Sequence, residues 1–281
     1  MTAPNKENAA LQKNLSTFNS RLNQLSLLAV SSIEWDLPAT CDVQYLEREL
    51  FNNSKVVFFV AENSLVCLSG FGSSKPNLYG VPLQRTITAK NGFTAELTNE
   101  NSVICYDNTL RLNSKNTAIE YALRLAQLDR IIELNANAQK TPFIIKATKE
   151  NELSVRNAYA GVDNSEDYIA ITEDFREDAL QVLKSDVPFT GLQLRTLQQS
   201  IIDEYLNMRG ISTANTNKPE RLITSEVAAS NGGLKIYQAA YLAPRQAVCD
   251  ELNRRFGRYL ERPAAVRFRK DMIDMIGGEA E

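Results

Sequence analysis

Three long segments of this chain repeat their apolar residues at helical spacing. In the first, from Ala9 to Trp35, two interleaved rows of apolar residues recur every seven positions. The second, Thr117 to Asn137, and the third, Thr190 to Gly210, each open with a Thr that is followed three residues later by Glu or Gln, the capping box of a helix start. Each segment also carries a populated polar face beside its apolar stripe. The commoner structure with this pattern is a self-contained helical bundle. The alternative is a ring in which neighbouring subunits share helices and the polar faces line a channel, and the pattern alone does not choose between them.

A β-type block stands between the first two long helices. A shorter helical stretch, Val43 to Leu50, precedes it, and the compact apolar run from Val56 to Val60 opens it. Glycines and prolines punctuate the block, which is typical of short strands joined by turns, so we expect a small barrel or meander. The other expected strands are Ser64 to Ser69, Arg85 to Ala89 and Ser102 to Tyr106. Together with the long helices, this block makes the fold class α+β.

Charge is unevenly distributed along the second half of the chain. From Lys146 to Asp186 there are ten acidic and five basic residues, within a compact α+β insert at 141–186. From Arg209 to Lys270 there are twelve basic and five acidic residues. An acidic insert is therefore followed by a basic C-terminal region. The elements expected in these two regions are strands at Phe143 to Ile145 and Tyr168 to Ile171, a mobile loop from Ile211 to Lys235, a helix from Pro244 to Leu260 and a strand from Ala264 to Phe268.

Composition removes several kinds of chemistry. The chain has no histidine, which excludes histidine general bases, serine–histidine triads and histidine metal sites. No P-loop motif for binding phosphate occurs, and a formal charge of −3 argues against a chain-wide basic surface that grips nucleic acid. The four cysteines, Cys41, Cys67, Cys105 and Cys249, have no metal-binding spacing, so we predict reduced, buried thiols.

An acidic run from Asp163 to Asp178 could be imagined as the site of a metal-dependent nuclease. A two-metal centre needs carboxylates that converge from several elements, so we interpret this local run as a solvated acidic face. No apolar run approaches the ~18–20 residues that a membrane helix needs, and the first residues lack the apolar core of a signal peptide. The sequence thus predicts a soluble protein without cofactor, metal ion or membrane contact.

Short motifs distributed along the chain carry a resemblance to a known family. They read N-A-Q-K-T-P within Asn135 to Pro142, N-E-L-S at Asn151 to Ser154, L-K-S-D-V-P at Leu183 to Pro188, E-R-L-I-T at Glu220 to Thr224 with Glu226 and Val227 after it, V-R-F-R at Val266 to Arg269, and E-W at Glu34 and Trp35 with L-P at Leu37 and Pro38. In the order and spacing of these pieces, over roughly residues 25–270, the chain resembles the connector, or portal (upper collar), proteins of small short-tailed podophages that replicate by protein priming.

The resemblance implies a structural DNA conduit and not an enzyme. We expect a twelve-subunit ring at one vertex of the capsid, through which double-stranded DNA is packaged and later ejected. The protein would be a virion component that is made in the cytoplasm of the host bacterium. The implied partners are other copies of the chain, double-stranded DNA bound without sequence specificity, the major capsid protein and scaffold, a packaging ATPase and a lower collar or tail protein.

The family's organisation, carried onto this chain, gives three long stem helices, a β-rich wing with an SH3-like part and a narrow-end, or clip, domain. The implied ranges are 1–38 for the N-terminal arm and first long helix, 39–112 for the wing, 113–140 for the second stem helix, 141–186 for the narrow end, 187–210 for the third stem helix, and 211–281 for the channel loop and wide-end C-terminal region.

Five positions match the DNA channel of the family. Lys184 matches a channel-ring lysine, whereas a second such lysine aligns with Gln193, so that ring is missing or displaced here. Arg195, two residues further on, does not take the same direction on a helix. Lys218 and Arg221 match basic residues of the channel loop, which would act as a valve against backsliding of DNA. A neutral or acidic lumen with a few basic rings would lower friction on the DNA.

The start of the chain departs from the family's best-known members, whose basic arm contacts a packaging RNA. Met1 to Asn14 holds only Lys6 and Lys13 against Glu7. This composition, with the acidic insert, argues against RNA anchoring and leaves a direct protein contact with the motor equally open. Two other function classes remain as alternatives. Metal-dependent cleavage would reveal a carboxylate-dependent DNA-processing enzyme, and a low mass in solution would reveal a small helical adaptor.

Overall fold

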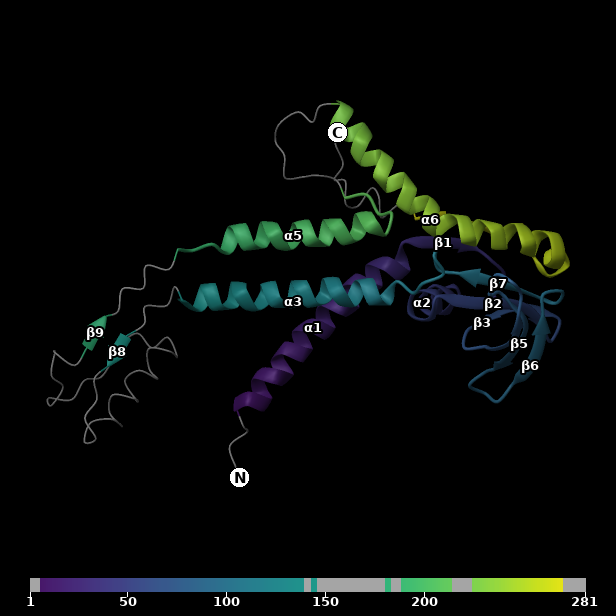
Figure 1. Cartoon of the computed structure of the whole chain (residues 1–281), viewed down its shortest axis with the longest axis horizontal. Coiled ribbons are helices and arrows are strands. Elements are labelled where there is room, and N and C mark those ends of the chain that lie inside the picture. Colours follow the sequence, from purple (N-terminus) through teal and green to yellow (C-terminus); the bar gives the residue numbers. More distant parts are fainter. Residues whose placement is uncertain (1–5, 139–142, 146–179, 183–187, 214–223, 270–281) are drawn as a thin grey trace, which may run out of the picture. The chain divides into compact units, whose positions relative to one another are not determined.

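The computed structural model describes residues 6–138, 143–145, 180–182, 188–213 and 224–269 (Figure 1). The chain divides into two compact units, one of Met1–Gln127 with Gln198–Glu281 and the other of Leu128–Leu197. Two long helices, α3 (Lys115–Ala138) and α5 (Gly191–Met208), each continue from one unit into the other. The larger unit also holds helices α1 (Lys6–Ser31), α2 (Val43–Asn53) and α6 (Thr224–Phe256).

Two three-stranded antiparallel sheets make up the β-rich block of the larger unit. In the first sheet the central strand is β2, which pairs with β3 and β7; in the second it is β5, which pairs with β4 and β6. The strands are β2 (Lys55–Ala61), β3 (Ser64–Leu68), β4 (Gly72–Pro76), β5 (Pro82–Thr88), β6 (Thr94–Thr98) and β7 (Ser102–Tyr106).

Strand β2 is apolar along most of its length because both of its faces are buried. Val56 and Phe58 belong to one hydrophobic core, and the alternate residues Val57 and Phe59 belong to another. Side chains alternate across a strand, so an uninterrupted apolar run serves two cores at once. The second core joins the two sheets, because it also contains Ile87 of β5. Two further pairs of short antiparallel strands are β1 (Ile33–Asp36) with β10 (Ala265–Phe268), and β8 (Phe143–Ile145) with β9 (Leu180–Val182).

Helices α1, α3 and α5 share a core over only part of their length. Leu25 of α1, Tyr121 of α3 and Tyr205 of α5 are buried together, and the two tyrosine rings lie 5.5 Å apart, centroid to centroid. Away from this core, large apolar side chains of the same helices are exposed. They are Leu11, Leu15 and Leu27 on α1, Leu123, Ile131 and Leu134 on α3, and Leu192 and Leu197 on α5. Among the described residues, these helices therefore do not close a self-contained bundle.

The first helix ends earlier than the sequence pattern predicts. It stops at Ser31, and strand β1 at residues 33–36 takes the place of the last residues of the expected helix, which ran to Trp35. The buried Ile33 and Trp35 face Phe268 and Val266 in the β10 ladder. The expectation is wrong because the pairing partner lies more than 200 residues away in the sequence, where local periodicity carries no signal for it.

The last helix begins earlier than predicted. Helix α6 starts at Thr224, so much of the expected mobile loop, Ile211 to Lys235, is helical, and Pro244 lies inside the helix instead of at its start. The helix ends at Phe256, followed by a short 3₁₀ turn, Gly257–Tyr259. Proline favours the first turn of a helix, and this preference misled the prediction.

Other differences are smaller. Helix α3 begins at Lys115, so the expected capping box at Thr117 lies within the helix, and the amide of Asn116 instead donates to the side chain of Asn113. Strands β4 and β6 were not predicted. The strand expected at 168–171 lies outside the described residues. All four cysteines are free and buried, as predicted.

Candidate nucleic-acid interface and its supporting junction

Only two of the five predicted channel residues lie in the described part of the chain. Gln193 and Arg195 are both on α5, and both side chains are exposed. Two positions along an α-helix correspond to about 200° of rotation, so the two side chains leave α5 on nearly opposite sides. Lys184, Lys218 and Arg221 lie outside the described residues. The channel site of five residues therefore stays a prediction.

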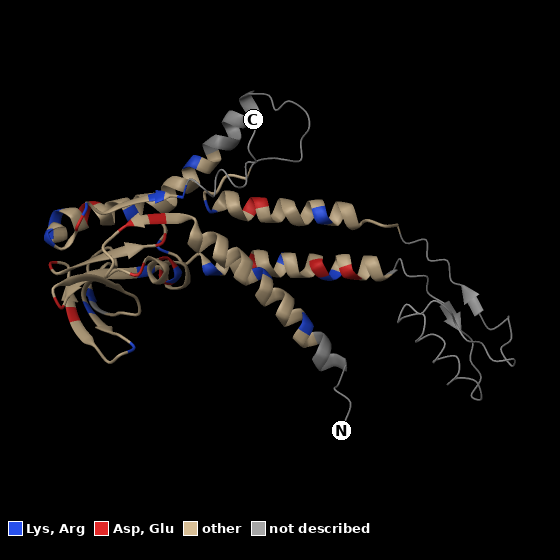
Figure 2. Cartoon of the chain, turned by 180° about the vertical axis from the view of Figure 1, so that it is seen from behind, with Lys and Arg blue, Asp and Glu red and all other residues tan. Residues whose placement is uncertain are grey.

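The polar faces of α3 and α5 carry charges of both signs. Helix α3 holds three basic and three acidic residues, and α5 holds one basic and two acidic residues. Figure 2 shows the two signs interspersed along both helices. Some of these charges are paired within a helix, as Arg124 is with Glu120. Neither helix presents a continuous basic stripe, which is the usual footprint of tight phosphate binding.

A buried cluster of charges lies where these helices meet the β-rich block. Its centre is Arg245 of α6, whose side chain is completely buried. The guanidinium donates to both carboxylate oxygens of Glu47, at 2.9 and 2.8 Å, and to Oδ1 of Asp107 at 3.0 Å. It also donates to the backbone carbonyls of Asp107 and, at 2.9 Å, Tyr241. A guanidinium has five N–H donors, and here all five find acceptors.

A second buried arginine extends the cluster to the end of α5. Arg209 donates to Oγ of Ser114 at 2.6 Å, and its guanidinium lies 3.9 Å from Oδ2 of Asp107 and 4.1 Å above the ring of Tyr241. The hydroxyl of Ser114 donates to the same carboxylate of Asp107. Arg209 Nε is buried without a hydrogen-bond partner. The indole of Trp35 completes the set by donating to Glu47 at 2.7 Å.

Charge balance explains why the two arginines stay charged in the interior. Burial works against the charge on Arg245, but the carboxylates of Glu47 and Asp107 outweigh it and raise the pKa of the guanidinium. At Arg209 burial is again the largest influence, and Asp107 offsets it, so that the pKa is also raised. Two buried cations thus face two buried carboxylates, which is the arrangement that buried charges require.

The cluster joins three elements and two connecting segments of the larger unit. We call it the charge junction; its members are Trp35 of β1, Glu47 of α2, Asp107 after β7, Ser114 before α3, Arg209 after α5, and Tyr241 and Arg245 of α6. It fixes the start of α3, the end of α5 and the middle of α6 to the β-rich block. The junction positions the helices; it contains no nucleophile or proton acceptor open to a substrate.

Sequence reasoning did not find the charge junction. Arg209 and Arg245 were counted only as part of a basic C-terminal region, and Asp107 was not singled out. One signal was present: Glu47 falls on the face of its helix that also carries Val43, Leu46 and Leu50, at the spacing of an apolar stripe. An acidic residue in such a stripe indicates a buried partner of opposite charge.

The described residues contain no group of three or more His, Cys, Asp and Glu side chains that could hold a metal ion. The acidic run from Asp163 to Asp178 lies outside them. None of the helices in the described ranges is long and apolar enough to cross a membrane.

Comparison with known proteins gives a family and a fold. The model of a family described as Phage Connector (GP10) matches residues 5–273. The fold is similar to that of a chain in the portal and tail of native bacteriophage P68, with a TM-score of 0.53 and 17% sequence identity, over 96% of this chain and 92% of that one. More distant similarities are to a chain in the virion of a native gene transfer agent particle, with a TM-score of 0.47, 10% identity and coverage of 96% and 86%, and to an HK97 family phage portal protein from Corynebacterium diphtheriae, with a TM-score of 0.44, 10% identity and coverage of 92% and 95%.

Proposed function

The chain belongs to the phage connector family, and from this premise we propose that it forms a twelve-subunit ring through which double-stranded DNA enters and leaves a phage head. The family is shown by a match over residues 5–273, almost the whole chain. The protein is accordingly a structural connector, or portal, component of a phage virion and not an enzyme, and its fold is portal-like with mixed helix and sheet content. Membership in this family removes the alternative of a carboxylate-dependent DNA-processing enzyme.

The observation that best supports a ring is the exposure of apolar side chains on the long helices. Leu27 of α1 is 67% exposed and Leu192 of α5 is 75% exposed, and other large apolar residues of the same helices are also in solvent. Apolar side chains gathered along an element are an unusual surface for a protein that acts alone. Neighbouring copies that pack their long helices against one another would bury these residues.

The charges of α3 and α5 suit a passage for DNA better than a binding site for it. A conduit must not hold the phosphate backbone tightly, because every retained phosphate contact slows movement. Mixed charges along both helices meet this need. In the proposed ring, Gln193 and Arg195 of α5, with Lys184, Lys218 and Arg221, contribute to the channel, and the last two act in a loop that resists backsliding of DNA.

The remaining partners follow from the same proposal. The narrow end, residues 141–186, would dock a separate packaging ATPase and later the lower collar or tail protein. The β-rich wing, residues 39–112, would face the major capsid protein and scaffold at the unique vertex. A packaging RNA is not part of the proposal, since the first fourteen residues contain only two lysines and one glutamate as charged groups.

The mass in solution tests the ring directly. Light scattering should give a particle near twelve times the chain mass of 31.4 kDa, and negative-stain images of the same peak should show rings with a central hole. Some rings assemble only with a scaffold, so the measurement is repeated with capsid and scaffold components present. A protein that stays monomeric or dimeric in both experiments contradicts the ring and favours a small helical adaptor.

A further inference from the structure

The turn between β4 and β5 carries two large apolar side chains at its tip. Leu78 is 100% exposed and Tyr79 is 84% exposed. The turn is held without them: the amide of Asn77 donates to the carbonyl of Val81 at 2.9 Å, and Oδ1 of Asn77 accepts from the amides of Tyr79 and Val81. Gly80, at φ +72°, supplies the left-handed conformation. The turn therefore needs neither side chain for its own structure.

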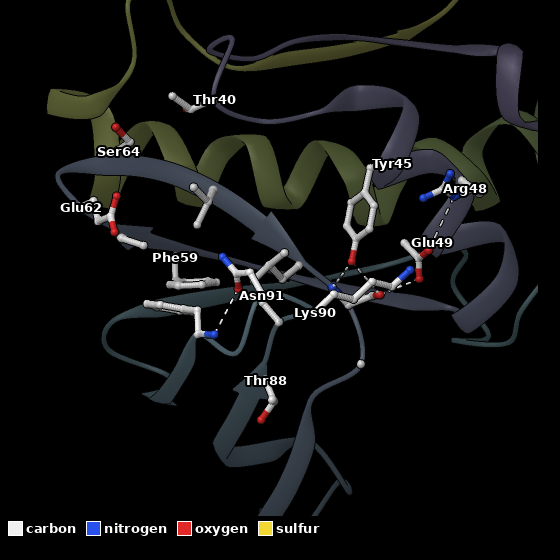
Figure 3. Close-up of a pocket in the computed structure, with 17 residues that line it drawn as sticks. Thr40, Tyr45, Arg48, Glu49, Phe59, Glu62, Ser64, Thr88, Lys90 and Asn91 are labelled. Carbon is white, nitrogen blue, oxygen red and sulfur yellow. Dashed lines mark hydrogen bonds and ion pairs between the residues drawn. The ribbon is translucent and has the colours of Figure 1, made fainter.

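An open groove lies at the other end of the same sheet. Its volume is about 940 Å³, and it is bounded by β2 and β3 of one sheet, the β5–β6 turn of the other, and helix α2 (Figure 3). The floor is apolar: Phe59 stacks on Phe93 with ring centroids 6.2 Å apart, and Val66 and Leu68 are half-buried beside them. Space of this size is at the upper end of the ~300–1,000 Å³ seen for binding pockets, enough for more than one side chain.

The rim of the groove is polar and already ordered. The hydroxyl of Tyr45 lies 3.1 Å from Oγ of Ser69 and accepts from the amide of the same residue at 3.2 Å. Ser69 Oγ in turn donates to Glu49 at 2.5 Å. Arg48 and Lys90 are exposed on the rim (Figure 3). An apolar floor inside a polar rim is the usual anatomy of a protein–protein contact.

Strand β5 separates the tip from the groove within one chain. Pro82, at its start, follows the turn directly, and Thr88, at its end, lines the groove. Seven residues of strand span roughly 20 Å. The tip of one chain therefore cannot fill its own groove, whereas the tip of a second copy can. A surface that meets a different surface of the next copy is a head-to-tail contact, which generates a ring when the rotation closes.

We propose that the tip formed by Leu78 and Tyr79 of one subunit inserts into the groove of the neighbouring subunit. The inference rests on the proposed ring and adds the residues of a contact between its wings. Tyrosine is among the residues that most often anchor protein–protein contacts, and the stacked phenylalanines offer its ring an apolar surface. Leu78 adds apolar area that is otherwise wholly in solvent.

Cysteine cross-linking tests the contact in the assembled protein. The double variant Leu78→Cys/Lys90→Cys places one thiol on the tip and one on the rim. A disulfide needs Cα atoms about 4.4–6.8 Å apart, so these two cannot join within one chain. Mild oxidation should give a ladder of covalent multimers on a non-reducing gel. The matched control Leu78→Cys/Glu100→Cys has its second thiol in the β6–β7 turn, at the tip end of the sheet, and should give no ladder.

A second variant tests whether the side chains of the tip contribute to assembly of the ring. Leu78→Ser/Tyr79→Ser changes only exposed side chains and should leave the subunit folded, yet it should raise the protein concentration needed for ring formation at least tenfold. The control Leu110→Ser/Leu112→Ser, which removes two exposed leucines elsewhere, should not.

The possible outcomes separate the inference from the function on which it rests. Rings that form normally in the tip variant and give no ladder in the cross-linking variant overturn the contact and leave the ring intact. Normal rings from the tip variant that fail to enter capsids would also overturn it, because the tip would then serve the capsid protein. A wild-type chain that forms no rings, even with capsid components, overturns the proposed ring and the contact together.

Discussion

Arg245 is a buried cation whose stability depends on two carboxylates from distant parts of the sequence. Its guanidinium meets Glu47 and Asp107, which lie 198 and 138 residues away. A buried ion pair recovers most of its desolvation cost only when its hydrogen bonds are complete, and those of this arginine are. Removing one partner therefore lowers the free energy of unfolding by more than the whole ion pair contributes to it, because the remaining charges stay buried and uncompensated.

The charge junction makes a prediction about the free energy of unfolding. Arg245→Met should lower it by about 3–5 kcal/mol, since Glu47 and Asp107 lose their shared counter-charge. Denaturant unfolding measures the change, at one protein concentration because assembly also adds stability. Arg124→Met is the control: its pair with Glu120 is exposed, and the expected loss is below ~1 kcal/mol. Equal losses in the two variants would mean that the junction does not hold the fold.

The buried thiol of Cys249 predicts a loss of stability at high pH. Burial, helped by Asp250, raises the pKa of this thiol from 9.0 to about 12. Between pH 9 and 12 the unfolded chain has released this proton while the folded chain keeps it, so the free energy of unfolding falls as pH rises. From pH 8 to pH 10.5 the contribution is on the order of 2 kcal/mol.

Urea unfolding of wild type and Cys249→Ala at pH 8 and pH 10.5 measures this contribution. The variant should lose less stability over that interval than wild type does, although Tyr121, whose pKa burial and Glu204 raise to about 12, continues to contribute in both proteins at higher pH. The same loss in both proteins would show that Cys249 does not cause it.

Helix α6 shows how a proline becomes part of a helix interior. Pro244 has no N–H to donate to the carbonyl of Ala240, four residues earlier. The amide of Thr109, in the loop after β7, donates to that carbonyl instead, at 3.1 Å. The next residue, Arg245, donates its side chain to the carbonyls of Tyr241 and Asp107. The proline thus leaves a carbonyl of the helix free to accept the hydrogen bond from the loop. Figure 1 draws α6 with a bend along its length.

Replacing this proline should detach the loop locally. In Pro244→Ala the new amide can donate to the Ala240 carbonyl and compete with Thr109. We expect the Thr109 amide to exchange with deuterium at least tenfold faster, while the amide at position 244 becomes protected. Hydrogen exchange measures both amides in one experiment. Unchanged protection at Thr109 would mean that the loop is held by the charge junction alone.

The elements also show which parts of the fold a sequence pattern can predict. Long amphipathic helices have a clear periodic pattern in the sequence. The starts of α3 and α5 were therefore predicted to within two residues. The apolar run of β2 was equally clear. Strand β1 was missed, and Pro244 was expected at the start of a helix, because both depend on distant partners: Phe268 and Val266 for β1, and Thr109 for the helix around Pro244. Tertiary contacts overrode local preference in both places.

At the scale of the whole molecule, the location of the basic residues decides which of them can meet a ligand, and their total number does not. The basic C-terminal region counts twelve cations in the sequence, but Arg209 and Arg245 are buried in the charge junction and add nothing to the surface. Arg267 forms ion pairs with Glu34 and Asp36 across the β1–β10 pair. A sequence pattern does not distinguish these structural cations from those that meet a ligand, because the distinction is one of burial and pairing. For the same reason, the candidate channel residues came from a resemblance between motifs, and composition alone would not have indicated them.

The proposed conduit predicts how added charge on α5 should act. If α5 faces DNA in the ring, Gln193→Lys adds one cation per subunit to the passage, and the assembled ring should bind duplex DNA more tightly at low salt. The slope of log affinity against log salt should also become steeper, because each neutralised phosphate contributes about −0.9 to it. Gln84→Lys, on the exposed face of β5, adds the same charge in the β-rich block and should change neither quantity. Measuring the affinity of both variants over a salt series separates a local effect at α5 from general attraction. If α5 does not face the DNA, a charge added at either position attracts DNA equally. Equal slopes for both variants would remove α5 from the channel, whereas a steeper slope for Gln193→Lys alone would explain why glutamine suits a position where DNA must keep moving.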